Sequence, residues 1–305
     1  MKKRSKKALS DSQADRVVTE LSGNGVLVNE NGLEVVGRRV SLLAYCRDLI
    51  ARLPFIWEEA RSKAFQSGRG TLLGSLWLII DPLLQVGLYA VVFGLIMKTN
   101  RGMDNFIGFL VIGVVFFRIA TQGINDGAGL IKRSRPLISS FAFPRAALAV
   151  STNIRQVLDN IPSILVALVL ALSTQIGKPI GISLIMIIPL VLVVAVFNLG
   201  WTLIVARATA FVPDLIPLVS TVVRALFFIS GVFFSIERFE THKWLQDFVL
   251  ANPIYRIISL TRAIVLDSSW GAFNDWAYII AWSICLTIVG FIYFWRAEAR
   301  YAGVV

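Results

Sequence analysis

The chain has 305 residues, of which 56% are hydrophobic and 16% are charged, and its formal net charge is +11. Its mean hydropathy is +0.72. Since an average soluble domain carries about 25% charged residues, this composition excludes an ordinary soluble domain and predicts a membrane protein. Of the 30 Lys and Arg residues, 13 lie in the first 70 positions, before any long apolar run. This distribution is typical of a cytoplasmic tail that follows the positive-inside rule, and it argues against a nucleic-acid-binding protein.

The N-terminal part of the chain divides into two segments. Residues 1–40 are polar and basic, and we expect a cytoplasmic tail there. In residues 41–70, apolar side chains recur at helical spacing between charged ones, and Pro54 interrupts the pattern. A segment with this many charges cannot cross hydrocarbon. It therefore predicts an amphipathic helix, bent or restarted at Pro54, that lies in the inner membrane interface.

Residues 71–305 contain six apolar runs, each long enough for the roughly 20 helical residues that cross a bilayer. Lys and Arg are more numerous on one side of these runs, twenty against seven, which places both termini in the cytoplasm. We therefore predict an all-α polytopic membrane protein with a domain of six transmembrane helices. The predicted spans are 72–97, 105–126, 147–173, 182–206, 215–236 and 275–295.

The segment between the fifth and sixth spans, residues 244–266, holds two apolar stretches that are each too short to span. They are separated at Asn252–Pro253, and proline disfavours a helical conformation at the residue before it. The pattern predicts two short outer helices in a V. Either they enter the outer leaflet as a re-entrant gate, with protein or water covering their backbone, or they rest on the membrane surface as an amphipathic pair.

Five ionisable residues lie inside the predicted spans, at similar depths from the cytoplasmic end. A charge at the centre of a bilayer costs about 3 kcal/mol or more, so each side chain is expected to face protein or water. Two interpretations stay open: the residues pair between helices, or they line a substrate path in which the surplus positive charge attracts phosphate. The residues of this charged layer are Asp81, Arg118, Arg155, Asp159 and Arg224.

The sequence lacks the motifs of a stand-alone enzyme. It contains no G-x-x-x-x-G-K-[ST] phosphate-binding loop and no nucleophile elbow, and its single histidine, His242, does not support a Ser-His-Asp set. No Cys/His/Asp cluster has metal-ligand spacing, and we expect neither a metal nor a cofactor on this chain. If the protein moves a substrate across the membrane, the energy must come from an ion gradient or from another polypeptide.

Two motifs and several single residues form a pattern from about residue 41 to the C-terminus. "LGSLWLIIDP" begins the first span, "LISSFAFPRAAL" follows the second, Asp214 precedes the fifth, and Asn252–Pro253 separates the outer helices. Together they resemble the permeases of polysaccharide-exporting type-2 ABC transporters, which move O-antigen, teichoic acid or galactan chains. Asp81 and Gly231 depart from the family pattern, which has proline at the second of these positions. The residues that match the two motifs are Leu73, Gly74, Trp77, Pro82, Leu137, Ile138, Phe143, Pro144 and Arg145.

The resemblance implies a role for the loop after the second span. In such exporters this loop forms a short coupling helix that docks in a cleft of a separate ATP-hydrolysing subunit. Apolar anchors with a rim of charges, here Arg133 and Arg135, are typical of a protein interface. An alternative is that the aromatic side chains lie in the lipid interface. The residues expected to couple to the ATPase are Leu137, Ile138, Phe141, Phe143, Pro144 and Arg145.

The resemblance also implies the partners and the substrate. It predicts a homodimer in the bacterial inner membrane, paired with two copies of an ATP-binding cassette ATPase that bind ATP and Mg. The dimer would export a glycan on a polyprenyl pyrophosphate carrier, with Asn252, Pro253 and Tyr255 in an outer gate. Because sugar rings have apolar C–H faces that stack on flat side chains, aromatic residues near the path are candidates for contact with the glycan. These candidates are Phe116, Phe117, Phe227, Phe228, Phe233 and Phe234.

Three other functions stay open. A drug- or lipid-exporting ABC permease would share the topology and need a partner ATPase. A secondary transporter should have halves related by an inverted repeat and discontinuous helices at mid-bilayer, and the sequence indicates neither. A membrane-embedded glycan enzyme would need carboxylates at a membrane surface, and the outer loop contains some without recognisable spacing. These are Glu237, Glu240, Asp247, Asp267 and Asp275.

Overall fold

The computed structural model describes residues 41–66, 74–96, 105–140, 143–175, 181–236 and 243–304. The expected tail, residues 1–40, lies outside the described residues, as do Leu73, Phe141, Glu237 and Glu240. The described ranges are almost entirely helical and hold no strand, which confirms the all-α prediction for this part of the chain.

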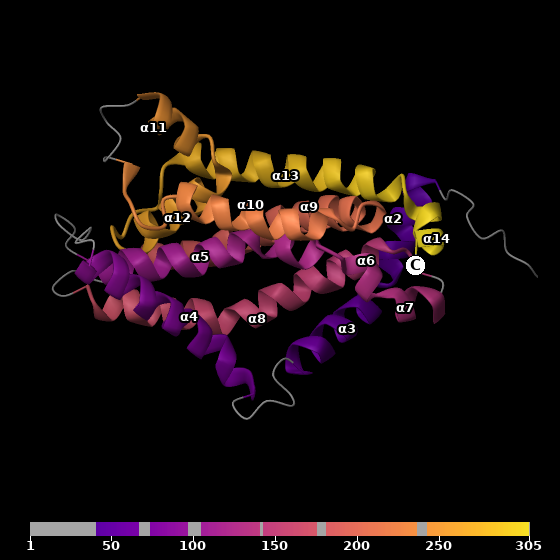
Figure 1. Ribbon diagram of the computed structural model, residues 1–305, viewed down its shortest axis with the longest axis horizontal. Helices are drawn as coiled ribbons and strands as arrows, with labels where there is room; N and C mark the ends of the chain where they lie inside the picture. The colour runs from indigo at the N-terminus through magenta and orange to yellow at the C-terminus, as the bar shows by residue number, and fades with distance from the viewer. Residues whose placement is uncertain are drawn as a thin grey trace, which may run out of the picture. The chain divides into compact units, whose positions relative to one another are not determined.

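Long helices run side by side through the unit that extends from Arg39 to Val305, and short helices lie near their ends (Figure 1). In chain order the elements are α2 (Leu42–Ala51), α3 (Leu53–Gln66), η2 (Gly74–Leu76), α4 (Trp77–Tyr89), η3 (Ala90–Ile96), α5 (Phe106–Gly127), α6 (Leu130–Arg133), α7 (Arg135–Ser140), α8 (Ala146–Ser173), η4 (Ile182–Met186), α9 (Ile187–Phe211), α10 (Leu215–Ile229), α11 (Lys243–Leu250), α12 (Pro253–Val265), α13 (Phe273–Trp295), η6 (Glu298–Arg300) and α14 (Tyr301–Val304).

The first two helices, α2 and α3, meet near Pro54. The side chain of Ser41 caps α2, and its Oγ accepts a hydrogen bond from the backbone nitrogen of Ala44 at 3.4 Å. Pro54 is the second residue of α3, where a missing N–H breaks no intrahelical bond. α3 packs against α8 and buries Ile56, whereas Trp57 is exposed. The pair is therefore amphipathic, and its place in the membrane interface stays a prediction.

Within the described ranges, four helices are long and apolar enough to cross a membrane. They are α5, α8, α9 together with η4, and α13, which correspond to the second, third, fourth and sixth predicted spans. The first and fifth predicted runs form shorter apolar helices, Ile79–Gly94 and Leu215–Ile229. The count of six spans therefore stays a prediction.

The most buried of these helices is α5, which runs between α8 and α9 (Figure 1). Within its most apolar 18-residue window, 78% of the residues are buried, compared with 39% for α8, 33% for the helix ending at Phe211 and 28% for α13. α5 also contacts α4, α10 and α12. Most polar side chains on α5 are consequently at least partly covered by protein, although Asn125 is exposed.

Small and polar residues hold α5 against α9. The side chain of Asn198 accepts a hydrogen bond from the nitrogen of Gly123 at 3.1 Å and donates one to the carbonyl of Ile119 at 2.7 Å. A Cβ atom on Gly123 would lie 2.3 Å from the carbonyl oxygen of Asn198, so this close approach requires glycine. Such contacts are typical of membrane helices, because apolar side chains gain little by leaving lipid for protein.

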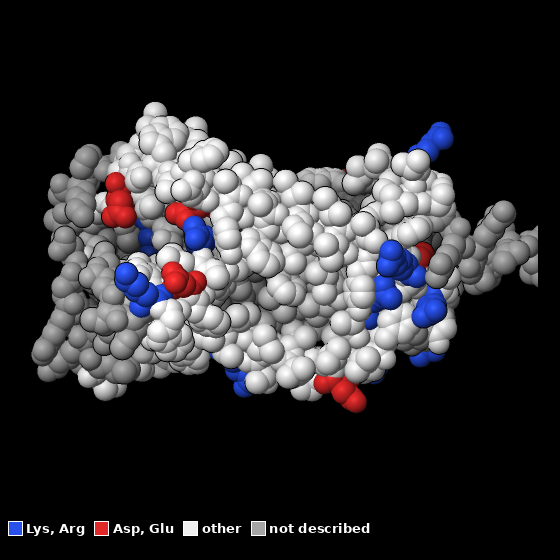
Figure 2. All heavy atoms as spheres, turned by 90° about the horizontal axis from the view of Figure 1, so that it is seen from above, with Lys and Arg blue, Asp and Glu red and all other residues white. Residues whose placement is uncertain are grey.

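On the face shown in Figure 2, most charged side chains gather toward the two ends, and a broad band between them is largely uncharged. α6, α7 and α14 lie at one end of the helices, and α11 and α12 lie at the other (Figure 1). Large apolar side chains on the long helices are exposed, among them Leu88, Val169, Leu192 and Ile288. This distribution is the one expected of helices that cross hydrocarbon.

The segment after α10 contains two short helices, α11 and α12, bent by 85° at a break before Pro253. The side chain of Asn252 caps α12 and accepts a hydrogen bond from the nitrogen of Ile254 at 3.0 Å. Ile257 and Ile258 of α12 are fully buried, and α12 packs against α5 and α13. The break thus falls where the sequence predicted it. The burial of α12 favours a protein-covered helix over a pair that rests on the membrane surface, and its role as a gate stays a prediction.

Candidate functional site

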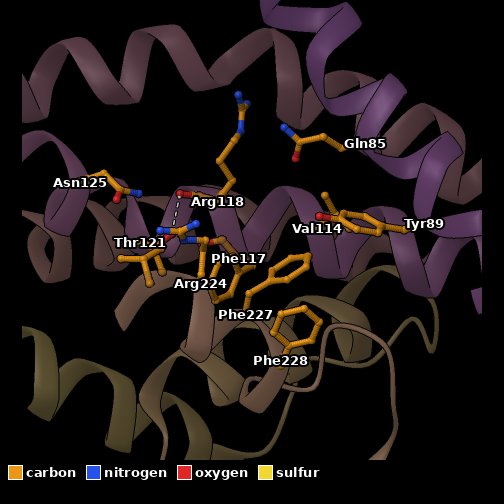
Figure 3. Close-up of a pocket in the computed structure, with 11 residues that line it drawn as sticks. Gln85, Tyr89, Val114, Phe117, Arg118, Thr121, Asn125, Arg224, Phe227 and Phe228 are labelled. Atoms are coloured by element: carbon orange, nitrogen blue, oxygen red, sulfur yellow. Dashed lines mark hydrogen bonds between the residues drawn. The ribbon is translucent and has the colours of Figure 1, made fainter. Parts of the chain in front are cut away.

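A pocket of about 350 Å³ opens between α4, α5 and α10 (Figure 3). Two arginines, Arg118 of α5 and Arg224 of α10, contribute to its wall. Aromatic rings from all three helices form much of the remainder. They belong to Tyr89, Phe117, Phe227 and Phe228. The pocket therefore combines positive charge with flat apolar surfaces, between helices that are apolar on their outer faces.

Arg118 is held by residues from two neighbouring helices. Its Nη2 donates a hydrogen bond to the Oγ of Ser163 on α8 at 2.7 Å, and its Nη1 lies 3.9 Å from the Oδ2 of Asp81 on α4. The same Oδ2 accepts a hydrogen bond from Gln85 at 3.1 Å. Figure 3 shows the Arg118 and Gln85 side chains on the same side of the pocket. Because 3.9 Å is too long for a hydrogen bond, the ion pair with Asp81 is loose.

The other members of the charged layer are arranged differently. Arg224 is exposed, and its Nε donates to the carbonyl of Ser220 on the same helix at 3.3 Å. Within the described ranges no carboxylate lies within 4 Å of its guanidinium. Arg155 and Asp159 lie 3.2 Å apart, one turn from each other on α8, and neither lines the pocket. Of the five predicted residues, the pocket thus brings together Arg118 and Arg224.

The predicted aromatic candidates divide into two groups. Phe117 and Phe227 line the pocket and meet edge to face at 4.9 Å between ring centres, and Phe228 lines it as well. Phe233 extends this aromatic wall, since its ring stacks on that of Phe93 at 3.9 Å and meets Phe227 at 4.9 Å. Neither of the other two candidates lines the pocket.

Phe116 and Phe234 lie outside the wall of this pocket. Phe116 is fully buried in the core of the helix bundle, so it has no surface to offer a substrate. Phe234 is half-buried and is not part of the pocket wall.

Residues 61–266 match the family described as ABC-2 type transporter. This range covers more than half of the chain and includes the three helices that form the pocket. The chain belongs to the ABC-2 type transporter family. The resemblance predicted from the motifs is thereby confirmed, and the protein is a membrane permease of an ABC transporter.

Three named relatives of this ABC-2 type transporter align over most of their length. The O-antigen export system permease protein RfbA of Myxococcus xanthus is 24% identical over 199 residues, which cover 65% of this chain and 75% of the relative. A protein of the same name from Klebsiella pneumoniae is 24% identical over 245 residues, covering 78% and 89%. The polysialic acid transport protein KpsM of Escherichia coli is 23% identical over 233 residues, covering 74% and 87%.

In this ABC-2 type transporter, the predicted coupling residues around α7 mostly face the transporter's own core. Ile138 and Phe143 are each 8% exposed and pack in one cluster with Tyr45, Phe294 and Tyr301. These two apolar side chains therefore fix α7 to its own chain, and their docking into a partner ATPase stays a prediction.

The remaining coupling candidates complete this arrangement. Leu137 is half-buried against the same cluster, Pro144 is buried, and Arg145 lies 3.3 Å from the carboxylate of Glu298. The face of α7 that stays exposed is polar and basic. It consists of Arg135, Pro136, Ser139 and Ser140. The role of this segment in coupling stays a prediction.

The predicted gate residues contact the end of α10. The Nδ2 of Asn252 donates to the Oγ of Ser230 at 2.9 Å. Gly231 follows with a φ of +68°, and a Cβ atom there would lie 2.6 Å from the ring of Tyr255. Pro253 opens α12 at the break. The outer segment and the pocket-lining helix α10 are therefore joined directly.

Sequence reasoning missed Arg262, which it counted among the charges outside the membrane. The side chain is 7% exposed and donates to the carbonyls of Gly231 and Val232 at 2.8 and 2.9 Å. The available signal was an arginine within the apolar helical stretch "IISLTRAIVL". Among the carboxylates considered for an enzyme, Asp275 is paired with Arg256. In the part of the chain that the structure describes, no group of three or more His, Cys, Asp or Glu residues could hold a metal ion.

Proposed function

We propose that this permease is the membrane subunit of an ATP-driven exporter that moves a polysaccharide linked to polyprenyl pyrophosphate out of the cytoplasm. The named relatives are permeases or transport proteins for O-antigen and polysialic acid, which supports a polysaccharide substrate of O-antigen, galactan or teichoic-acid type. The chain has no phosphate-binding loop of its own. The energy therefore comes from a separate ATPase, which binds ATP and Mg.

The observation that carries this proposal is the combination of Arg118 and Arg224 with aromatic rings in one pocket. Guanidinium groups bind phosphate oxygens with two hydrogen bonds at once, and they are less strongly hydrated than ammonium groups. The ion pair of Arg118 with Asp81 is loose, and Arg224 is an exposed residue of the same pocket wall. A pyrophosphate between the two would be neutralised, while sugar rings stack on Phe117 and Phe227.

The proposed exporter has six spans and both termini in the cytoplasm. α4 and the π-helix η3 follow one another directly and together have the length of one span, with 13 and 7 residues. α10 has 15 residues and continues into a segment buried against α12. Lys132, Arg133 and Arg135 make the end that carries α6 and α7 basic, which by the positive-inside rule is the cytoplasmic side of the inner membrane.

The proposed assembly is a homodimer with two ATPase subunits. The pocket is open on one side, and apolar side chains on α4 and α10 next to it are exposed, including Leu84, Leu88, Leu218 and Val222. A second copy placed against these helices would bury this apolar surface and close the two pockets into one passage. The ATPase subunits would act on the basic face of α7 and move the helices as rigid bodies.

The cellular test uses removal of the permease and return of pocket variants. We expect depletion to abolish one surface polysaccharide while its lipid-linked precursor accumulates inside the cell. The double variant Arg118→Gln/Arg224→Gln should fail to restore export although it reaches the membrane, whereas the control Arg300→Gln, at an exposed position away from the pocket, should restore it. Unchanged surface polysaccharide together with altered drug resistance or lipid export would support the alternative, a drug- or lipid-exporting permease.

A further inference from the structure

The start of α8 is capped by residues from two distant parts of the chain. The nitrogen of Ala146 donates to the Oη of Tyr45 on α2 at 3.0 Å, and the nitrogen of Arg145 donates to the Oε1 of Glu298 in η6 at 2.8 Å. No local side chain caps this helix. The first N–H groups of a helix have no partner within it, and they favour a nearby negative charge. Tyr45 and Glu298 therefore satisfy a requirement that the sequence around Arg145 leaves open.

The two capping side chains are also bonded to each other. The Oη of Tyr45 donates to the Oε2 of Glu298 at 2.8 Å, and the Nη1 of Arg145 lies 3.3 Å from the Oε1 of the same carboxylate. Tyr45 is 3% exposed, and its ring meets that of Phe291 on α13 at 5.9 Å. The network of Tyr45, Arg145 and Glu298, which we call the α8 clamp, is thus closed and largely buried. Satisfied networks of this kind rigidify the segments that they join.

The α8 clamp adjoins the α7 segment. Ile138 of α7 and Phe143 pack in the same apolar cluster as Tyr45, Phe294 and Tyr301. The Oη of Tyr301 donates to the carbonyl of Phe294 at 3.2 Å, which holds the chain after α13 in place. A displacement of α7 consequently pulls on α2 and on the end of α13 as well as on α8.

We propose that Glu298 is a positioning residue for energy coupling, which with Tyr45 fastens the α7 segment to α2 and to the last span. A movement imposed on α7 then reaches three helices together. Without the clamp, the α7 segment would keep its apolar packing and its chain connections to α6 and α8, but it would lose this polar connection to α2 and η6. This inference rests on the proposed function, since it assumes that a partner ATPase acts on α7.

The test compares ATP hydrolysis with glycan export in vesicles that contain the complete complex. Glu298→Ala removes all three carboxylate contacts, one with Tyr45 and two with Arg145, and Tyr45→Phe removes the hydroxyl while it keeps the ring packing. We expect both variants to assemble and hydrolyse ATP, while the amount of glycan exported per ATP falls by about fivefold or more, the lower end of usual coupling effects. Glu298→Gln should lose less, because its amide oxygen still accepts from the nitrogen of Arg145.

Asp48→Ala is the matched control. Asp48 is an exposed acid on the same helix as Tyr45 and pairs with Arg52, one turn away, at 3.1 Å. We expect its export per ATP to equal that of the wild type. If Tyr45→Phe and Glu298→Gln exported as much glycan per ATP as the wild type, the coupling role would be overturned. This outcome decides the question even if Glu298→Ala fails to fold. A wild-type complex that exports no glycan would instead contradict the proposed function itself.

Discussion

The guanidinium carbon of Arg262 lies 3.3 Å from the centre of the Phe109 ring. The same guanidinium donates hydrogen bonds to the carbonyls of Phe109, Gly231 and Val232. No carboxylate among the described residues lies within 4 Å of it. A buried cation that is stabilised by carbonyl dipoles and an aromatic face thus joins α12 to α5 and to the end of α10.

Replacement of Arg262 should destabilise the protein strongly. Arg262→Met leaves the buried carbonyls of Gly231 and Val232 without these donors, and each unsatisfied group costs about 1–3 kcal/mol, partly relieved by water. We expect a loss of roughly 2–4 kcal/mol in the free energy of unfolding. Arg262→Lys should lose less because it keeps a charged donor, although its single ammonium cannot reproduce the planar fork of the guanidinium. Thermal unfolding in detergent measures both. Arg300→Lys, at an exposed site, serves as the control, and equal unfolding temperatures for all three variants would contradict the structure.

The turn after α10 should depend on glycine at position 231. Its φ of +68° is unfavourable for other residues, and a Cβ atom would meet the Tyr255 ring at 2.6 Å. Gly231→Ala should therefore cost about 1–3 kcal/mol. Gly231→Pro should cost more, because the proline ring fixes φ near −65°. Gly87→Ala on α4 is a suitable control, since nothing lies within 4 Å of its Cβ position. A Gly231→Pro variant as stable as this control would disprove the described turn.

Two substitutions near α7 should separate folding from partner binding. Phe143 is buried in its own chain, so Phe143→Ala should lower the free energy of unfolding by about 3–5 kcal/mol. Arg135 is exposed, so Arg135→Glu should leave stability unchanged and reduce the amount of ATPase that co-purifies. Thermal unfolding and co-purification are measured on the same preparations. The reverse result, with a stable Phe143→Ala that releases the ATPase, would restore Phe143 as an anchor for the partner.

The two pocket arginines should differ in their effects on stability. Arg118→Gln loses the hydrogen bond to Ser163 and the loose ion pair with Asp81, so we expect a loss of about 1 kcal/mol. Arg224→Gln loses one bond on its own exposed helix face and should unfold at the wild-type temperature. Export should fall in both variants. If Arg118→Gln were unstable and fully active once folded, Arg118 would be a structural residue outside the substrate path.

Burial raises the pKa of the Glu298 carboxyl above its ordinary value of 4.5, although hydrogen bonds from Arg145 and Tyr45 oppose this effect. The folded protein then keeps this proton at a pH where the unfolded chain has lost it. The contribution of Glu298 to stability is therefore present below pH 4.5 and decreases as the pH rises through the raised pKa.

This titration can be measured as a difference between two proteins. We expect the unfolding temperature of the wild type to fall relative to that of Glu298→Gln as the pH rises above 4.5, because the glutamine variant lacks the titrating group. Other groups titrate in both proteins and cancel in the comparison. Parallel curves over this range would show that Glu298 ionises as it does in the unfolded chain.

Four spans and two helix breaks could be predicted because their causes are local. Long apolar runs predict α5, α8, α9 and α13 by length alone. Proline fixes the breaks near Pro54 and at Asn252–Pro253, because it restricts the residue before it and cannot donate a hydrogen bond. The pocket arginines were found for a similar reason, since a charge inside an apolar run requires a protein or water environment.

The features that the sequence could not predict depend on contacts between distant segments. The sequence does not reveal that α10 ends at Ile229. The turn that follows is held by Asn252, which precedes α12, and by Arg262, which lies within α12. Ile138 and Phe143 have the composition of an interface, yet the surface that they bury belongs to Tyr45 and the C-terminal residues. Apolar side chains indicate that burial occurs without identifying the partner.

The most direct test of the central claim is transport by purified components. The permease is placed in vesicles with or without its ATPase, a lipid-linked polysaccharide is supplied on one side, and its appearance on the other side is measured. We expect movement only when the ATPase and ATP are both present, and its loss in Arg118→Gln/Arg224→Gln. Movement by the permease alone, or ATP-driven movement that the pocket variant leaves unchanged, would contradict this account.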